Sequence, residues 1–276
     1  MPEIPELEAM RATLNRRVAG QAVARAQVRI PLVLRRPPKD DFERTLSGNR
    51  LLTTNRRGKY LLLRFASGHL FAVHLMLTGR LQLGDPGSPM PKRTAWRLTF
   101  ADGRELRYFD EKLDGKAYLV TEADLPLIPR WPEMGPDVLD PALTADAFAQ
   151  RLRRFPGQIK RALVNEAFVA GIGNAYADEI LFEARVYPFL PSRRLAPEQV
   201  RALHTAIHTV YDWAVPIVAA RMGDTIDEKI RDFLKVHRKG GRPCPVCATP
   251  ITEVSPNKRV TSYCRRCQDG GRTGEE

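Results

Sequence analysis

Residues 61–75 read LLLRFASGHLFAVHL, two apolar runs separated by Ser67-Gly68. Apolar runs of this length around a short turn predict a β-hairpin. A second hairpin is predicted at residues 96–109, where apolar and polar residues alternate on both sides of Asp102-Gly103. Asp-Gly between alternating runs is the strongest short-range hairpin signal. Residues 20–118 are therefore expected to form several antiparallel strands arranged as a sandwich or a barrel.

The sequence before and after this β-rich stretch predicts helices. Pro5 suits the first turn of an N-terminal helix, whose apolar residues follow at spacings of three and four until Gly20 ends it. Thr144 is the expected cap of a later helix, and helical periodicity continues over three further segments: 158–170, 174–185 and 197–221. Five prolines between residues 122 and 143 break any regular element.

The predicted fold class is α+β multidomain. We expect an N-terminal β-rich domain (1–121), an interdomain linker (122–143), a helical domain (144–234), a cysteine-bearing ribbon (235–268) and a disordered tail (269–276).

The charge of the chain indicates an anionic partner. Among 276 residues, 44 are Lys or Arg and 32 are Asp or Glu, which gives a formal charge of +12. Such an excess favours a polyanion such as nucleic acid. No stretch approaches the roughly 18 apolar residues of a spanning helix. The N-terminus is acidic and interrupted by proline, unlike a secretory signal. We therefore expect no membrane partner and a cytoplasmic location.

Four cysteines form two CxxC pairs, Cys244/Cys247 and Cys264/Cys267. Each pair can present two thiolates on one tight turn, and two turns make a closed tetrahedral site that suits a single structural Zn²⁺. The alternative is four free, buried cysteines. From His237 to Cys267 there are seven Lys or Arg against one acid, Glu253. This ribbon is predicted to have almost no core and to present basic side chains to phosphates or bases, although a solvated charged surface is the simpler alternative.

Three further motifs make the pattern specific. They are PEIPE at residues 2–6, RRGKY at residues 56–60 and VAGIGNAYADE at residues 169–179. Together with the cysteine ribbon, they closely resemble the formamidopyrimidine-DNA glycosylase/endonuclease VIII family of base-excision-repair enzymes. The resemblance implies an N-terminal β-sandwich with flanking helices, a helix–two-turns–helix domain and a zinc ribbon, with DNA across the cleft between the halves. It also implies a bacterial, nucleoid-associated monomer that acts on damaged double-stranded DNA.

The resemblance assigns the catalytic residues to the two N-terminal motifs. Removal of Met1 would make Pro2 a secondary amine, and an α-amino group with a pKa near ~8 is partly neutral at physiological pH. Pro2 is then the implied nucleophile, which attacks C1′ of the deoxyribose and leaves an iminium that permits strand scission. Glu3 corresponds to the general acid/base, Glu6 to a second carboxylate, and Lys59 to a lysine that contacts the phosphate and sugar around the lesion. Without the other motifs, these residues would be an ordinary helix start and a basic turn.

The implied DNA contacts lie in both halves of the chain. Asn174 follows Gly171-x-Gly173 and opens a helix, where it can cap the helix and bind phosphate together. By resemblance, Lys160 and Arg259 also contact phosphates. Once the damaged nucleotide is extruded, the gap must be filled. Three residues are expected at this gap: Met76, Leu77 and Lys112.

Two departures from the family pattern concern the lesion. Where the 8-oxoguanine branch has a wedge Met, an arginine that reads the orphaned base and an aromatic wedge, this chain has Leu77, Leu113 and Asp114. Residues 223–242 are short, as in the endonuclease VIII branch, whereas Ile4 matches the formamidopyrimidine branch. We therefore expect formamidopyrimidines or oxidised pyrimidines to be preferred over 8-oxoguanine, with the branch left open.

Three functions remain to be compared. The first is a bifunctional DNA glycosylase and abasic-site lyase, supported by all four motifs. The second is a catalytically silent protein that binds damaged or abasic DNA, suggested by the altered gap-filling segment. The third is a zinc-ribbon adaptor in transcription or translation, which leaves the N-terminal motif unexplained. Borohydride trapping separates the first from the second.

Overall fold

The computed structural model describes residues 1–255 and 259–268, so the tail predicted at 269–276 lies outside the described residues. The chain divides into two compact units. Unit 1 comprises Met1–Pro132 and Val215–Ile230, and unit 2 comprises Glu133–Ala214 and the described residues from Arg231 onward. In the described part of the chain, no helix combines the length and the apolar character needed to cross a bilayer.

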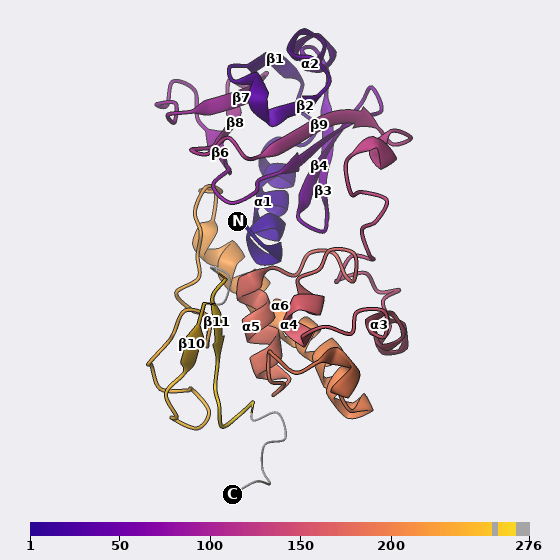
Figure 1. Cartoon of the computed structure of the whole chain (residues 1–276). Coiled ribbons are helices and arrows are strands. Elements are labelled where there is room, and N and C mark those ends of the chain that lie inside the picture. Colours follow the sequence, from indigo (N-terminus) through magenta and orange to yellow (C-terminus); the bar gives the residue numbers. More distant parts are fainter. Residues whose placement is uncertain (256–258, 269–276) are drawn as a thin grey trace, which may run out of the picture. The chain divides into compact units, whose positions relative to one another are not determined.

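Unit 1 contains two sheets and two flanking helices (Figure 1). The five-stranded sheet has the order β2-β9-β5-β4-β3, with β2 Leu34–Arg36, β9 Lys116–Thr121, β5 His69–His74, β4 Tyr60–Phe65 and β3 Leu51–Arg57. The four-stranded sheet has the order β1-β7-β8-β6, with β1 Val23–Val28, β7 Thr94–Phe100, β8 Glu105–Phe109 and β6 Arg80–Gly84. The flanking helices are α1 Ile4–Arg17 and α2 Lys39–Leu46, and short 3₁₀ turns lie at Pro31–Val33 and Leu125–Leu127.

Both predicted hairpins are confirmed. Strands β4 and β5 pair antiparallel, with Leu63 opposite Phe71, and β7 pairs antiparallel with β8 across the Asp102-Gly103 turn. One pairing differs from the all-antiparallel expectation, because β2 runs parallel to β9. Strand β2 has only three residues and pairs with a strand about 80 residues away, so the local alternation of apolar and polar residues could not predict it.

Aromatic side chains from both sheets make the core of unit 1. Phe71 of the five-stranded sheet lies 5.0 Å from Phe42 of α2 and 4.9 Å from Trp96 of the four-stranded sheet, measured between ring centroids. Trp96 in turn stacks on Tyr108 at 5.5 Å. Since Phe71 and Trp96 belong to different sheets and are both fully buried, the sheets pack face to face as a sandwich.

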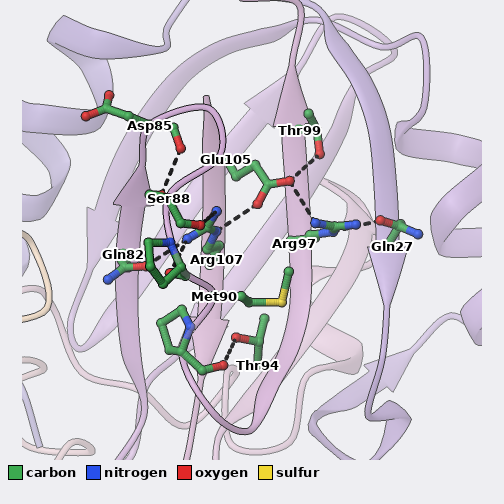
Figure 2. A network of polar contacts seen from close by, with 12 residues as sticks. Gln27, Gln82, Asp85, Ser88, Met90, Thr94, Arg97, Thr99, Glu105 and Arg107 are labelled. Atoms are coloured by element: carbon green, nitrogen blue, oxygen red, sulfur yellow. Dashed lines mark hydrogen bonds and ion pairs between the residues drawn. The ribbon is translucent and has the colours of Figure 1, made fainter. Parts of the chain in front are cut away.

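A polar network fixes the four-stranded sheet (Figure 2). The Arg107 side chain is only 3% exposed, and its Nε donates to Glu105 Oε2 at 2.7 Å. The other oxygen of Glu105 accepts from Arg97 at 2.8 Å. Arg107 also donates to the carbonyls of Ser88 and Pro89, at 3.1 and 2.9 Å. The buried arginine therefore fastens the β6–β7 loop to the sheet.

The segment Val215–Ile230 belongs to unit 1 although it is far from the rest of that unit in sequence. The hydroxyl of Thr13 in α1 donates to the Gly223 carbonyl at 3.0 Å. Arg16 and Arg17 of the same helix both pair with Asp224. Helix α6, Pro197–Met222, is continuous across the division between the units.

Unit 2 contains three shorter helices and a small ribbon (Figure 1). These are α3 Ala145–Leu152, α4 Ile159–Leu163, α5 Asn174–Glu183, a 3₁₀ turn at Ser192–Arg194, and the paired strands β10 Thr252–Val254 and β11 Thr261–Tyr263. Thr144 caps α3 as predicted, because its Oγ1 accepts from the Ala147 N–H at 3.2 Å.

Two predictions for unit 2 were wrong in detail. The helix predicted over 158–170 ends at Leu163, since the Asn165 side chain accepts the Ala167 N–H at 3.1 Å and competes with further helical turns. The ribbon also has a small core, in which Ile251 and two cysteines pack with Phe182 and Val236. Phe182 of α5 and Val236 at the start of the ribbon complete this core, and both lie outside the stretch from His237 to Cys267 whose charge balance was considered.

Candidate active site and metal centre

The N-terminal motif builds the start of helix α1. Glu3 is the N-cap residue, and Glu6 Oε2 accepts the Glu3 N–H at 2.9 Å, so the two glutamates form a capping box. Both are almost completely buried, at 3% and 0% exposure. Pro2 directly precedes this cap, where the positive end of the helix dipole disfavours a protonated amine. The amine of Met1 donates to the Leu77 carbonyl at 3.1 Å, and the Pro2 nitrogen is an amide as long as Met1 is attached to it.

Lys59 lies on the turn between β3 and β4 and is 7% exposed. His74 at the end of β5 was not predicted as a site residue. Burial, followed by the charges of Lys59, Lys116 and the Met1 amine, lowers the pKa of His74 to about 3. Burial together with these charges therefore keeps His74 neutral. Its Nδ1 accepts the Met76 N–H at 3.2 Å and so helps to shape the turn that carries Leu77.

The predicted gap-filling residues lie on two loops of unit 1. Met76 has φ +52°, in the left-handed region that L side chains rarely adopt, and Leu77 is 55% exposed. Leu113 on the other loop has φ +55°. Backbone strain of this kind often accompanies functional loops, because the surrounding structure must enforce it.

Asp110, which sequence reasoning missed, joins these two loops. It is fully buried and accepts from the Thr78 hydroxyl, the Lys112 N–H at 3.1 Å and the Gly115 N–H at 2.9 Å. Burial alone would raise the pKa of Asp110, but these hydrogen bonds and one from Tyr108 lower it. The carboxylate thus stays charged and holds the Met76–Leu77 turn beside the Lys112 loop. The exposed Lys112 side chain remains on the surface.

Three predicted DNA-binding residues of unit 2, Lys160, Asn174 and Arg259, line one cavity of about 600 Å³. The remaining lining residues are Gln158, Arg161, Val164, Asn165, Phe189 and Thr261. Arg161 and Asn165, which the motifs did not single out, are exposed there. A cavity with two exposed guanidinium groups and several amides suits an anion such as a phosphate.

The expectation that Asn174 caps helix α5 was wrong. Gly173 is the N-cap, and Asn174 is the first helical residue. Its Nδ2 instead donates to the Val260 carbonyl at 2.9 Å. Gly171, with φ +117°, provides the backbone conformation that brings the chain into this helix.

The four cysteines form the predicted metal site. Their sulfur atoms all lie within 4.8 Å of one another, with Cys244 and Cys267 at 3.8 Å and Cys247 and Cys264 at 3.4 Å. A tetrahedron with zinc–sulfur bonds of about 2.3 Å has sulfur atoms roughly 3.8 Å apart, so the donor set fits Zn²⁺. Burial raises the pKa of the Cys264 thiol, whereas hydrogen bonds from Thr249 lower the pKa of Cys247 to about 6. The chain therefore carries one structural zinc site.

Three family models match the chain in order. They are described as the formamidopyrimidine-DNA glycosylase N-terminal domain (residues 1–117), the formamidopyrimidine-DNA glycosylase H2TH domain (134–224) and the zinc finger found in FPG and IleRS (241–270). The formamidopyrimidine-DNA glycosylase of Symbiobacterium thermophilum is 38% identical over 97% of this chain and 89% of its own length. The enzyme of that name from Moorella thermoacetica is 36% identical, over 92% of this chain and 94% of its own.

Solved structures agree with these relatives. The Lactococcus lactis formamidopyrimidine-DNA glycosylase, non-covalently bound to DNA with an abasic site, is similar with a TM-score of 0.86 and 25% identity, over 97% of this chain and 99% of that one. The MutM (Fpg) protein of Thermus thermophilus gives a TM-score of 0.84 and 30% identity, over 98% of this chain and all of that one. The predicted α+β fold is confirmed, and the chain belongs to the formamidopyrimidine-DNA glycosylase family.

Proposed function

We propose that this protein is a base-excision-repair enzyme, a bifunctional DNA glycosylase and abasic-site lyase that removes oxidised bases from double-stranded DNA. The observation that carries the proposal is the position of Pro2, which directly precedes the buried capping box of Glu3 and Glu6. Relatives of this architecture are named formamidopyrimidine-DNA glycosylases, and some were solved with abasic-site or Fapy-dG DNA. The charge of +12 is suited to such a substrate.

The proposed reaction uses the chain's own groups. After Met1 is released, the Pro2 nitrogen attacks C1′ and the bond from C1′ to the base breaks, so that the departing base takes up the proton that the Pro2 nitrogen loses. Glu3 then protonates the sugar ring oxygen as the bond from that oxygen to C1′ breaks. The product is an iminium between Pro2 and C1′. Loss of a proton from C2′ then expels the 3′ phosphate, and water hydrolyses the imine to restore the amine. Lys59 is proposed to hold the phosphate and sugar during these steps, while the zinc site stabilises the ribbon and takes no part in bond breaking.

The proposed substrates are formamidopyrimidines or oxidised pyrimidines rather than 8-oxoguanine. Leu113 and Asp114 support this, since neither side chain supplies the arginine or the aromatic wedge of the 8-oxoguanine branch. We propose that a monomer acts on the duplex, with Asn174 and Arg259 on phosphates, the largely buried Lys160 supporting them, and Met76, Leu77 and Lys112 at the gap. A chromosomal substrate would make the cytoplasm its place of action.

Borohydride trapping on an abasic duplex, read by intact-protein mass spectrometry, tests this function. We expect a species that lacks Met1 and carries DNA, because borohydride reduces the iminium to a stable amine. The Pro2→Gly variant should bind the same duplex with nearly unchanged affinity but lose most strand scission. Unchanged scission by this variant would remove Pro2 from the mechanism. Salt-sensitive binding by a wild type that cannot be trapped would instead identify a silent damage-binding protein.

A further inference from the structure

A buried charge cluster in unit 2 is not explained by the proposed chemistry. The Asp178 side chain is 0% exposed, and its Oδ1 lies 2.6 Å from Nζ of Lys160, which is 8% exposed. Its Oδ2 lies 2.7 Å from His237 Nδ1 and accepts the Ser262 N–H at 3.2 Å. A buried carboxylate carries a large desolvation cost, so a cluster of this kind has a defined set of partners.

Lys160 directs its remaining donors to the ribbon. Its Nζ donates to the Val260 carbonyl at 2.8 Å and to Thr261 Oγ1 at 2.9 Å. The ammonium group of Lys160 is thus engaged by two hydrogen bonds to the ribbon and by an ion pair with Asp178, and the side chain is only 8% exposed. The resemblance implies a direct phosphate contact for Lys160, whereas its geometry indicates an indirect role.

The Val260 carbonyl receives a second donor, Asn174 Nδ2, at 2.9 Å. Val260 directly follows Arg259, which is exposed and lines the same cavity. Within residues 1–255 and 259–268, the Arg259 side chain has neither an ion-pair nor a hydrogen-bond partner. Its position therefore depends on how the adjoining main chain is held.

We propose that Asp178 is a positioning residue for Arg259. It orients Lys160, which together with Asn174 holds the Val260 carbonyl and so presents the Arg259 guanidinium to a DNA phosphate before DNA arrives. A guanidinium held in place loses less side-chain freedom on binding than a mobile one. This inference rests on the proposed function, since it takes DNA as the occupant of the cavity.

A double-mutant cycle tests the proposal through DNA binding alone. The variants are Asp178→Asn, Arg259→Ala and their combination, measured on a duplex that contains a tetrahydrofuran abasic analogue at several salt concentrations. Asp178→Asn should weaken binding about tenfold, as expected for the loss of one charge-assisted phosphate contact. It should also reduce the salt slope by roughly one, as Arg259→Ala does. The double variant should bind no more weakly than Arg259→Ala alone, because both changes remove the same contact.

If Asp178 had a purely structural role, Asp178→Asn would only lower the fraction of folded protein. The folded molecules would keep the wild-type salt slope, and the effects of Asp178→Asn and Arg259→Ala on binding would add. Additive effects, or an unchanged slope, would overturn the proposal. The exposed Asp146 on α3 supplies the matched control, and Asp146→Asn should bind like wild type. Zinc content is measured on every variant, since a loss of metal in Asp178→Asn would account for weaker binding without any positioning role and would also overturn the proposal.

Asp178→Asn leaves the Lys160 charge buried and can prevent folding, so Lys160→Met/Asp178→Asn is the second variant. Removal of both charges together is often tolerated by a protein core. This variant should fold, retain zinc and show the reduced affinity and salt slope of Arg259→Ala, and wild-type affinity would overturn the proposal. Borohydride trapping of the wild type is run in parallel. A wild type that binds but is not trapped would refute the enzyme and leave the binding cycle valid, whereas additivity with normal trapping would refute only the positioning role.

Discussion

His74 carries a testable consequence of its burial. Its pKa is about 3 in the folded chain and near 6.5 when exposed, because burial and the charges of Lys59 and Lys116 disfavour its protonation. Between these values the unfolded chain binds more protons at this site. This contribution to stability is complete above pH 6.5 and falls by about 1.4 kcal/mol per pH unit below it.

We expect the His74 ring resonances to stay those of a neutral imidazole from about pH 8 to about pH 4.5 in an NMR titration, well above the folded-state pKa. The free energy of unfolding should also decrease less between about pH 6.5 and about pH 5 in His74→Gln than in wild type. A His74 resonance that titrates near its ordinary pKa would contradict both expectations.

Leu77 permits a test that separates function from stability. The side chain is 55% exposed, so Leu77→Ala should change the free energy of unfolding by less than about 0.5 kcal/mol. Excision from duplex DNA should fall roughly tenfold, because an inserted apolar side chain offsets the cost of unstacking. Leu32→Ala is the matched control, since Leu32 is also 55% exposed. An equal loss in both variants would argue against a wedge role for Leu77.

At the residue scale, the candidate site residues could be predicted from motifs in the sequence, but the residues that hold the neighbouring loops in place could not. Pro2, Glu3 and Lys59 lie in short contiguous motifs, and the resemblance carried by all four motifs made them candidates; their roles remain predictions. His74 and Asp110 accept hydrogen bonds from loop residues that the fold brings next to them. No local sequence pattern distinguishes either residue from an ordinary polar residue. The indirect role inferred for Lys160 likewise depends on residues about 100 positions away.

At the scale of elements, Glu105 on β8 stabilises the four-stranded sheet through two ion pairs. Its two oxygens bind Arg97 and the buried Arg107 (Figure 2). Glu105→Ala should lower the free energy of unfolding by roughly 3–5 kcal/mol, because a buried charge loses its counter-ion. Urea denaturation measures this loss. Asp41→Ala, which breaks an exposed pair with Arg44, should cost less than about 1 kcal/mol. Equal effects would show that Arg107 is stabilised mainly by the loop carbonyls.

The elements that could be predicted are those with local signals. The hairpins follow from apolar runs or from alternation around short turns, and α3 follows from a Thr cap. The early end of α4 and the parallel pairing of β2 depend on a side-chain hydrogen bond and on a distant strand, respectively. The periodicity of apolar residues cannot predict either feature, since it indicates only which residues face a core.

At the scale of the whole molecule, the zinc site completes a ribbon with very few apolar residues of its own. Cys264→Ser should release the metal, unfold the ribbon and weaken DNA binding at least about tenfold, since structural zinc contributes directly to folding. Zinc analysis and binding to the abasic duplex measure both effects. Chelation of wild-type protein followed by zinc addition provides the control, because affinity should return. Full DNA affinity without metal would contradict the role of the ribbon.

The order of four motifs along the chain sufficed to predict the family and its α+β fold, because each motif carries separate information. The domain boundaries expected from the sequence remain predictions. The association of residues 215–230 with the first 132 residues had no signal in the sequence, since residues 215–221 only continue the helical pattern predicted from residue 197. Contacts such as that between Thr13 and Gly223 become visible only in three dimensions.

The course of helix α6 determines which parts of the gene encode each unit. The chain leaves unit 1 after Pro132, returns at Val215 and leaves again after Ile230, so neither unit corresponds to one uninterrupted stretch of gene. A recombination that exchanged the first 132 codons alone would produce a sandwich without the partners of Thr13 and Arg16. An exchange that keeps unit 1 intact therefore has to carry the codons for residues 215–230 together with those for residues 1–132.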